Sequence, residues 1–128
     1  MNPSPMIIVG ALAAAVALSG NGAAAAPAKS CFQMSQLQNT QPDGDQRIYA
    51  RVGLHDVYRL DLAFRCPALL SKEGIVLIPA GGQNLICTPL DLDVRARELG
   101  GSSTPCNIKS ISKLTPEEAA ALPPKVRP

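Results

Sequence analysis

Hydrophobic and polar residues alternate along two neighbouring segments in the middle of the chain, which is typical of half-buried β-strands. Ile48, Ala50 and Val52 share one face of the first segment, and the apolar residues of 58–64 share one face of the second. A Gly-Leu-His-Asp turn separates the two segments, so together they predict an antiparallel hairpin. Matching the apolar faces favours a register that pairs position 52 with 58, 50 with 60 and 48 with 62.

Other segments show different patterns. Ile75–Ile78 is apolar on both faces, which predicts a central strand that is covered on both sides. Residues 39–45, with the sequence NTQPDGD, predict a turn. Residues 85–87 and 92–96 predict two further strands, the second with one wet face.

A short helix is predicted near the carboxyl end. Thr115-Pro116-Glu117-Glu118 combines a cap hydroxyl, a proline at the first helical position and a glutamate three residues after the cap. Pro123-Pro124 ends the helix, because proline cannot continue it. The predicted fold is therefore mainly β (α+β): five or six antiparallel strands, as a sheet or a small barrel, with a short carboxy-terminal helix.

The amino terminus has the pattern of an export signal. The first 28 residues carry no charged side chain, and the apolar run Met6–Leu18 is shorter than the roughly 20 residues of a membrane span. A breaker and small residues follow it, which predicts a signal peptide over 1–28, cleaved near 25–28. An uncleaved membrane anchor is the alternative. We therefore expect a periplasmic or secreted protein with no membrane span after cleavage, one β-rich domain over 29–122 and a flexible Pro-rich tail over 123–128.

Composition argues against several functions. The 128 residues carry 12 Lys and Arg against 10 Asp and Glu, a formal net charge of +2, which gives no basis for a nucleic-acid partner. Two Tyr, two Phe and no Trp offer little surface for stacking bases or sugars. No hydrolase, zinc-protease, P-loop or dinucleotide motif is present. We therefore expect a non-enzymatic protein with no cofactor and no metal.

Four cysteines follow the predicted signal: Cys31, Cys66, Cys87 and Cys106. An even number in a short exported chain predicts two disulfides. No two of them have the spacing of a zinc site or of a C-x-x-C redox motif. Four cysteines allow three pairings. We favour Cys31–Cys106 with Cys66–Cys87 nested inside it, because the inner bridge would then join the ends of neighbouring hairpins.

Short motifs in a fixed order run through the chain from Cys31 to Pro123. They are Cys31-Phe32, Arg51-Val52-Gly53, Asp56–Leu60, Cys66-Pro67, Leu85-Ile86-Cys87, Cys106-x-Ile108 and Leu114–Glu118. On these motifs the chain resembles a family of small exported bacterial proteins, domain-of-unknown-function family 6491. The resemblance implies a signal peptide and four cysteines, and it implies no activity, ligand or catalytic residue.

Two groups of polar residues are candidate sites. In the predicted register Arg51 and Arg59 lie opposite each other on the wet face, with Asp61 diagonal to Arg51, which favours an anion or partner face. His55 and Asp56 form a candidate loop site at the hairpin tip, where the only histidine lies beside a carboxylate. An ordinary solvated turn explains the same two residues.

These features favour a non-enzymatic binding module of the cell envelope that uses its sheet edges or the Arg51/Arg59 face. Its partner would be an envelope protein or another envelope component. The alternative is a small inhibitor or enzyme acting on an envelope component, with the His55 loop inserted into an active site. A disulfide-shuttling or metal-carrying protein is a third hypothesis, and it would require free thiols.

Overall fold

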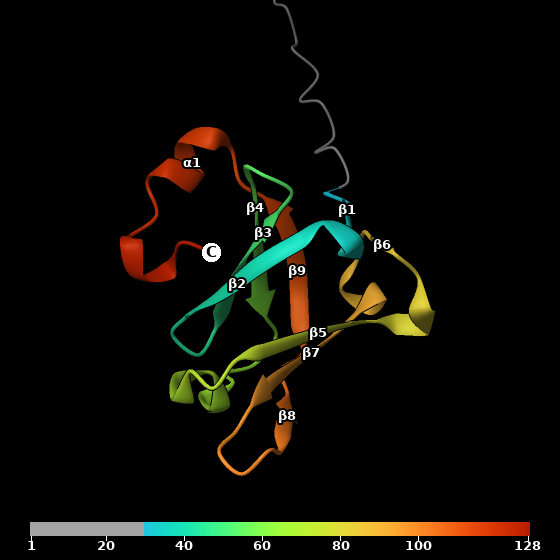
Figure 1. Ribbon diagram of the computed structural model, residues 1–128, viewed down its shortest axis with the longest axis vertical. Coiled ribbons are helices and arrows are strands. Elements are labelled where there is room, and N and C mark those ends of the chain that lie inside the picture. Colours follow the sequence, from blue (N-terminus) through green and yellow to red (C-terminus); the bar gives the residue numbers. More distant parts are fainter. Residues whose placement is uncertain (1–29) are drawn as a thin grey trace, which may run out of the picture.

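Nine strands in three antiparallel sheets and one short α-helix make up residues 30–128 in the computed structural model (Figure 1). This confirms the predicted mainly β fold, although the strands are more numerous than five or six and the described sheets form no closed barrel. The predicted signal peptide lies outside the described residues. Within residues 30–128, no helix has the length and apolar character needed to cross a membrane.

Two sheets form a sandwich, and a short ribbon lies at one end of it. The larger sheet has the order β2 (Leu37–Asp43), β3 (Arg47–Val52), β4 (Asp56–Leu62), β9 (Ile108–Lys113). The smaller sheet has the order β5 (Ile75–Pro79), β7 (Leu92–Arg97), β8 (Ser103–Pro105). The ribbon pairs β1 (Phe32–Gln33) with β6 (Leu85–Ile86). Short 3-10 helices connect the strands: η1 (Met34–Gln36), η2 (Pro67–Ser71), η3 (Ala80–Gly82) and η4 (Pro89–Asp91).

The β3–β4 hairpin has a register two residues away from the prediction. Val52 pairs with Asp56, where we predicted Tyr58. The tighter turn is possible because Gly53 adopts a φ of 62°, which is readily accessible only to glycine. A shift of two residues keeps every side chain on its own face. The predicted separation into an apolar and a polar face therefore holds, while the predicted cross-strand partners are wrong.

The edge strands β2 and β5 lie where the sequence predicted a turn and a central strand. The predicted turn over 39–45 is strand β2 as far as Asp43, and the turn itself covers only residues 44–46. The turn was predicted too long because proline is common in turns, but proline also occurs in edge strands, as Pro42 does here. Ile75–Ile78 is not a central strand, because residues 85–86 pair with β1 and, among the described strands, β5 pairs with β7 alone.

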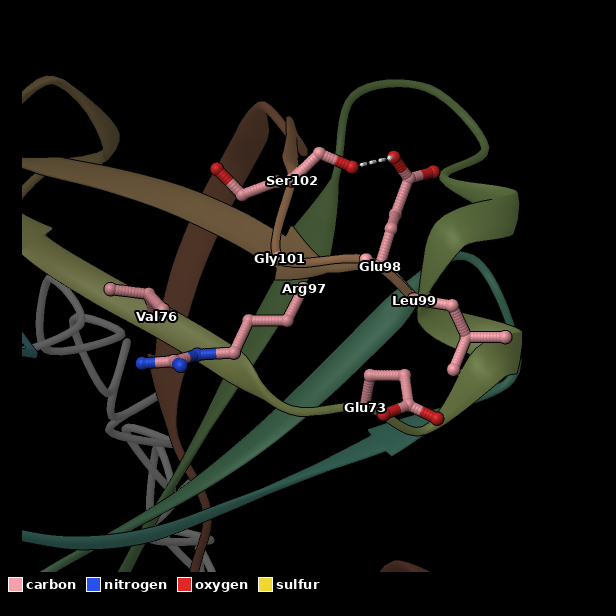
Figure 2. A pocket seen from close by; sticks show the side chains of 9 residues that line it. Glu73, Val76, Arg97, Glu98, Leu99, Gly101 and Ser102 are labelled. Atoms are coloured by element: carbon pink, nitrogen blue, oxygen red, sulfur yellow. Dashed lines mark hydrogen bonds between the residues drawn. The ribbon is translucent and has the colours of Figure 1, made fainter.

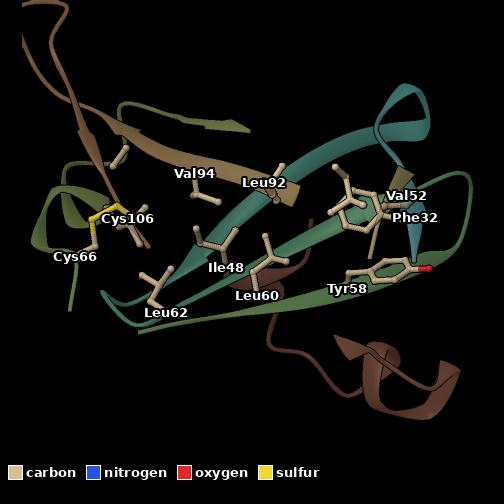
Figure 3. Packing of buried hydrophobic residues seen from close by; sticks show 13 residues of the cluster. Phe32, Ile48, Val52, Tyr58, Leu60, Leu62, Cys66, Leu92, Val94 and Cys106 are labelled. Carbon is tan, nitrogen blue, oxygen red and sulfur yellow. A yellow bond between two sulfur atoms is a disulfide. The ribbon is translucent and has the colours of Figure 1, made fainter. Parts of the chain in front are cut away.

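The core lies between the facing sides of the two larger sheets, as Figure 3 shows. Ile48 and Leu60 point into it from β3 and β4, and both are fully buried. Leu92 and Val94 of β7 face them from the smaller sheet. These are the apolar positions of the alternating pattern, so the sequence periodicity directly defines the core.

The disulfides are Cys31–Cys87 and Cys66–Cys106. Two bridges form as predicted, but the favoured nested pairing, Cys31–Cys106 with Cys66–Cys87, is wrong. The reason is strand order: Cys31 precedes β1 and Cys87 follows β6, and these two strands pair. Likewise Cys66 follows the end of β4 and Cys106 precedes the start of β9, and these strands are antiparallel neighbours.

A capping box starts the only α-helix of the described residues, α1 (Pro116–Ala120), as predicted. Thr115 Oγ1 accepts a hydrogen bond from the Glu118 N–H at 3.2 Å, and Glu118 Oε1 accepts one from the Thr115 N–H at 3.1 Å. Beyond the helix, Leu122 packs with Tyr49 in a small second cluster on the outer face of the larger sheet. Tyr49 is therefore buried although it lies on the polar side of its strand.

Residues 123–128, which we predicted as a flexible tail, instead form the turn η5 (Pro124–Val126) and pack back onto the domain. Val126 lies against the second cluster. Arg127 donates hydrogen bonds to the carbonyls of Leu122 at 2.8 Å and Ala120 at 3.1 Å, which satisfies the open end of the helix. The prediction failed because the arginine that caps the helix lies beyond the two prolines that end it.

The two long sides of the sandwich are built differently. On one side the chain runs from β8 into β9 and so crosses from the smaller sheet to the larger one. At the crossing Cys106 N–H donates to the Val94 carbonyl at 2.8 Å, and the Asn107 carbonyl accepts from Ala63 N–H at 2.8 Å. On the other side the sheets end in β2 and β5, which are not paired with each other (Figure 1). We refer to these as the closed side and the open side.

Candidate functional site

Asp61 is the centre of the polar cluster on the outer face of the larger sheet. Its carboxylate accepts from Arg47 Nε at 3.1 Å, from Arg59 Nε at 3.1 Å and from Ser110 Oγ at 3.2 Å. Burial opposes ionisation of Asp61, but the hydrogen bonds and the two positive charges outweigh it and hold the pKa of this carboxyl below its usual range. Arg59 is thus engaged by a carboxylate of the protein itself.

Arg51 is separate from this cluster. In the observed register it pairs with Asn39 on β2 and Val57 on β4, while Arg59 pairs with Tyr49. The predicted Arg51–Arg59 pair is therefore wrong, because the hairpin is shifted by two residues. The Nε of Arg51 is buried and has no hydrogen-bond partner within residues 30–128. The residues of the predicted anion face therefore lie apart: Arg59 and Asp61 belong to the cluster, and Arg51 does not.

A small hollow of about 230 Å³ lies at the Asp61 end of the larger sheet and is lined by Arg47, Arg65 and Lys109. Arg47 already contacts Asp61, and Arg65 Nη1 lies 3.8 Å from Asp45 Oδ2. Lys109 makes no ion pair with a described residue. Most of the positive charge around this hollow is therefore neutralised.

His55 and Asp56 lie at the exposed tip of the β3–β4 hairpin. The Asp56 carboxylate contacts Lys113 Nζ at 3.3 Å. Leu54 beside them has 82% of its surface exposed. In the part of the chain that the structure describes, no three His, Cys, Asp or Glu side chains are grouped closely enough to hold a metal ion. The tip presents one imidazole beside a carboxylate that is engaged in an ion pair.

A hollow of about 410 Å³ lies beside the β7–β8 turn, and Figure 2 shows its side chains. Glu98 Oε2 accepts from Ser102 Oγ at 3.3 Å. Arg97 extends in another direction along Val76, and Glu73 approaches from the far side. Because charges of both signs point apart from one another, they do not converge on one ligand group.

A larger cleft of about 610 Å³ occupies the open side, and we call it the β2/β5 cleft. Residues 39–44 of β2 and its turn form one wall, and Ile75 at the start of β5 lies across from it. Apolar side chains from η2 and η5 complete the lining, among them Leu70 and Val126. This volume falls in the range of small ligand sites.

The charged groups of the β2/β5 cleft are not balanced. Lys72 and Lys125 line it, and neither makes an ion pair with another described residue. Among the described residues of the lining, Asp43 alone carries a carboxylate, and it lies 3.8 Å from Arg47 Nη1. The cleft therefore offers two uncompensated positive charges to a ligand.

The sequence did not predict this cleft, because residues 39–45 were predicted as a turn and residues 75–78 as a central strand. The signal that identifies the walls is proline: Pro42 lies within β2 and Pro79 ends β5. Proline lacks the N–H that a central strand donates, so within a sheet it is confined to edges. Lys72 and Lys125 carry no pattern of their own, because the fold alone brings them together.

The described residues thus form a small β-sandwich domain with two disulfides and a cleft along its open side. The sequence profile of a family of unknown function, DUF6491, matches residues 3–127, and the chain belongs to this family. This confirms the resemblance inferred from the cysteine motifs. No curated protein and no solved structure matches the chain.

Proposed function

We propose that the protein is a non-enzymatic binding module of the cell envelope and that it holds its partner in the β2/β5 cleft. The observation that carries this proposal is the open side itself, where β2 and β5 each leave one edge unpaired among the described strands and border a cleft of about 610 Å³. The predicted alternative surface is weaker, because the Asp61 carboxylate already engages Arg59. Of the two binding surfaces considered from the sequence, the sheet edges are therefore favoured.

The envelope location is part of the proposal. Disulfides form and persist in oxidising compartments, and all four cysteines are paired. Paired cysteines also argue against a disulfide-shuttling role, which needs a free thiol. The apolar run Met6–Leu18 supports export through a cleaved signal.

The inhibitor hypothesis has one observation in its favour, the protruding Leu54 beside His55. An inhibitory loop would insert this tip into an active site, whereas a cleft binder would use residues some strands away. The two functions therefore place the partner at different parts of the molecule.

Site-specific photo-crosslinking in exporting cells separates them. A photo-reactive phenylalanine analogue replaces either Leu70, 59% exposed in the cleft, or Leu54, 82% exposed at the hairpin tip. We expect a discrete cross-linked product from position 70 and none from position 54. A product from position 54 alone supports the inhibitor, and products from neither position would contradict the proposed binding module.

A further inference from the structure

We propose that the β2/β5 cleft binds an extended, acidic peptide segment of its partner as an added strand along β2. This inference rests on the proposed function for the place of the site, and it adds the chemistry of the ligand. Three observations carry it: the direction of the free backbone groups, the length of the wall and the charge of the lining.

Pro42 determines which backbone groups of β2 face the cleft. It pairs with Ile48, and because proline has no N–H, this pair cannot exchange the two hydrogen bonds of a bonded pair. Bonded and non-bonded pairs alternate along an antiparallel ladder. The neighbouring residues Gln41 and Asp43 therefore bond to β3. Thr40 directs its N–H and C=O to the free edge, and Pro42 directs its C=O there.

Pro79 likewise shows which backbone groups of β5 face the cleft. It pairs with Leu92, so this pair too is of the non-bonded kind, and the alternation turns the backbone of Ile75 to the free edge. A hydrogen bond supports this assignment, because the Gly74 carbonyl accepts from Arg97 N–H at 2.9 Å and so points towards β7. Free backbone groups thus border the cleft from both sheets.

The wall formed by residues 39–44 suits an extended peptide. Its five strand residues, 39–43, span about 17 Å at roughly 3.3 Å each. A peptide that adds to such an edge gains main-chain hydrogen bonds from the edge, and neighbouring side chains select its sequence. Thr40 offers one donor and one acceptor, and Pro42 offers a further acceptor.

The lining selects for negative charge. Lys72 and Lys125 have no described carboxylate partner, whereas Asp43 has Arg47. Carboxylates on the incoming peptide would pair with the two lysines. An anionic glycan offers similar charge, but the cleft is lined by no aromatic side chain among the described residues and its edges are built for a backbone partner.

A second copy of the chain is a poorer occupant than a partner peptide. If β2 of two copies paired edge to edge, Pro42 would deprive the contact of a donor on each chain, which is how natural edge strands resist self-association. A peptide without proline supplies donors for both free carbonyls. We therefore assign the cleft to a different molecule.

The test uses the mature protein with both disulfides intact and three fluorescein-labelled peptides. The first is Glu-Val-Glu-Thr-Glu-Val-Glu, the second carries Lys in place of each Glu, and the third is the first with alternate backbone nitrogens methylated. Fluorescence anisotropy measures the affinities. We expect the acidic peptide to bind, the basic peptide to bind at least about tenfold more weakly, and the methylated peptide to bind at least about tenfold more weakly, since each loses contacts worth about 1.4 kcal/mol or more.

Variants locate the binding. Lys72→Glu with Lys125→Glu should weaken the acidic peptide by about tenfold or more, while Lys109→Glu, a charge reversal outside the cleft, should leave the affinity within about twofold. Thr40→Pro removes the last free donor of β2 in the cleft and should weaken binding of the acidic peptide by about fivefold or more. Pro42→Val adds a donor and should tighten binding by about fivefold. Circular dichroism of each variant checks that the fold is retained, and Pro42→Val keeps the test meaningful if Thr40→Pro fails to fold.

Equal binding of the acidic and basic peptides, or full binding of the methylated peptide, would overturn the inference. Binding of polygalacturonate, a polyanion without a peptide backbone, that depends on the two lysines but not on position 40 or 42 would also overturn it. In either case a cross-link from position 70 would leave the proposed binding module standing. Loss of that cross-link would remove both proposals.

Discussion

The closed side and the open side of the sandwich differ in how the edges of the two sheets are connected. On each side, both sheets end in an edge strand that carries unpaired backbone groups. On the closed side the chain itself passes from β8 to β9, and Cys66–Cys106 links the two sheets where it crosses. On the open side the edges remain apart, and Pro42 and Pro79 lie in the edge strands.

This difference separates stability from binding. On the closed side, Cys66 and Cys106 are buried within the core. Loss of their disulfide would therefore disturb the packing of both sheets. On the open side, the side chains that line the cleft are half-buried or exposed except for the buried Leu69, and a partner can use them and the free backbone groups without unfolding the domain. We therefore expect substitutions on the closed side and in the core to change stability, and substitutions on the open side to change association.

The largest effect is expected from the disulfide of the closed side. Cys66 and Cys106 are 4% and 2% exposed, so replacing both with Ala removes a bridge and leaves buried space. We expect a loss of about 3–5 kcal/mol in the free energy of unfolding. The matched variant is Cys31→Ala with Cys87→Ala, whose cysteines are only half-buried and leave less buried space, so its loss should be smaller by about 1 kcal/mol although its bridge closes the longer loop, 56 residues against 40. Urea unfolding measures both, and equal or reversed losses would contradict the comparison.

The next largest effect is expected in the core. Leu60 is fully buried, and Leu60→Ala should lower the free energy of unfolding by about 2–5 kcal/mol because it leaves a cavity. Leu70→Ala removes a side chain of the same size from the wall of the cleft, where it is 59% exposed. That change should stay within about 0.5 kcal/mol. A Leu70→Ala loss close to that of Leu60→Ala would show that the open side is part of the core.

A smaller effect is expected from the Asp61 cluster, and it depends on pH. The pKa of Asp61 is lower in the folded protein, so its contribution is present above the unfolded pKa of about 3.9 and is lost as the pH falls through the lower folded value. Asp61→Asn should lower stability by about 1 kcal/mol at pH 7 and flatten its dependence on pH below about 4. Urea midpoints measured from pH 7 to pH 2 test this. An acid limb as steep as that of the unchanged protein would contradict the assignment.

The smallest effect on stability is expected at the edge of β2. Pro42→Val should change the free energy of unfolding by less than about 0.5 kcal/mol, since the new N–H faces the open side. The same change should increase self-association, because it restores a donor to an exposed edge. Analytical ultracentrifugation over a range of concentrations measures the mass. A mass unchanged from that of the original chain would show that Pro42 does not protect this edge.

Much of the fold follows from local patterns. Alternation identified the β3–β4 hairpin and its buried face, and the residues of the capping box located the start of α1. These features depend on residues that are close in sequence. The predicted register of the hairpin was wrong by two residues. Alternation determines only which face each side chain occupies, and the turn that Gly53 allows determines which residues pair across the strands.

The errors concern features that depend on strand order. Cys31 meets Cys87 because β1 pairs with β6, and no local pattern specifies this pairing. The same pairing makes β5 an edge strand, and with it one wall of the cleft. The cleft could be anticipated in part, because Pro42 restricts its strand to an edge, but the facing edge and the two lysines come together only in the folded chain.

Residue-resolved amide hydrogen exchange at Thr40 and Gln41 tests the central claim most directly. These amides are adjacent in β2, and only that of Gln41 should be bonded to β3. We predict rapid exchange at Thr40 and slow exchange at Gln41 in the free protein, with Thr40 slowed by at least about tenfold when the acidic peptide saturates the cleft. A Thr40 amide that is already protected in the free protein, or that exchanges equally fast with the peptide bound, would contradict the account.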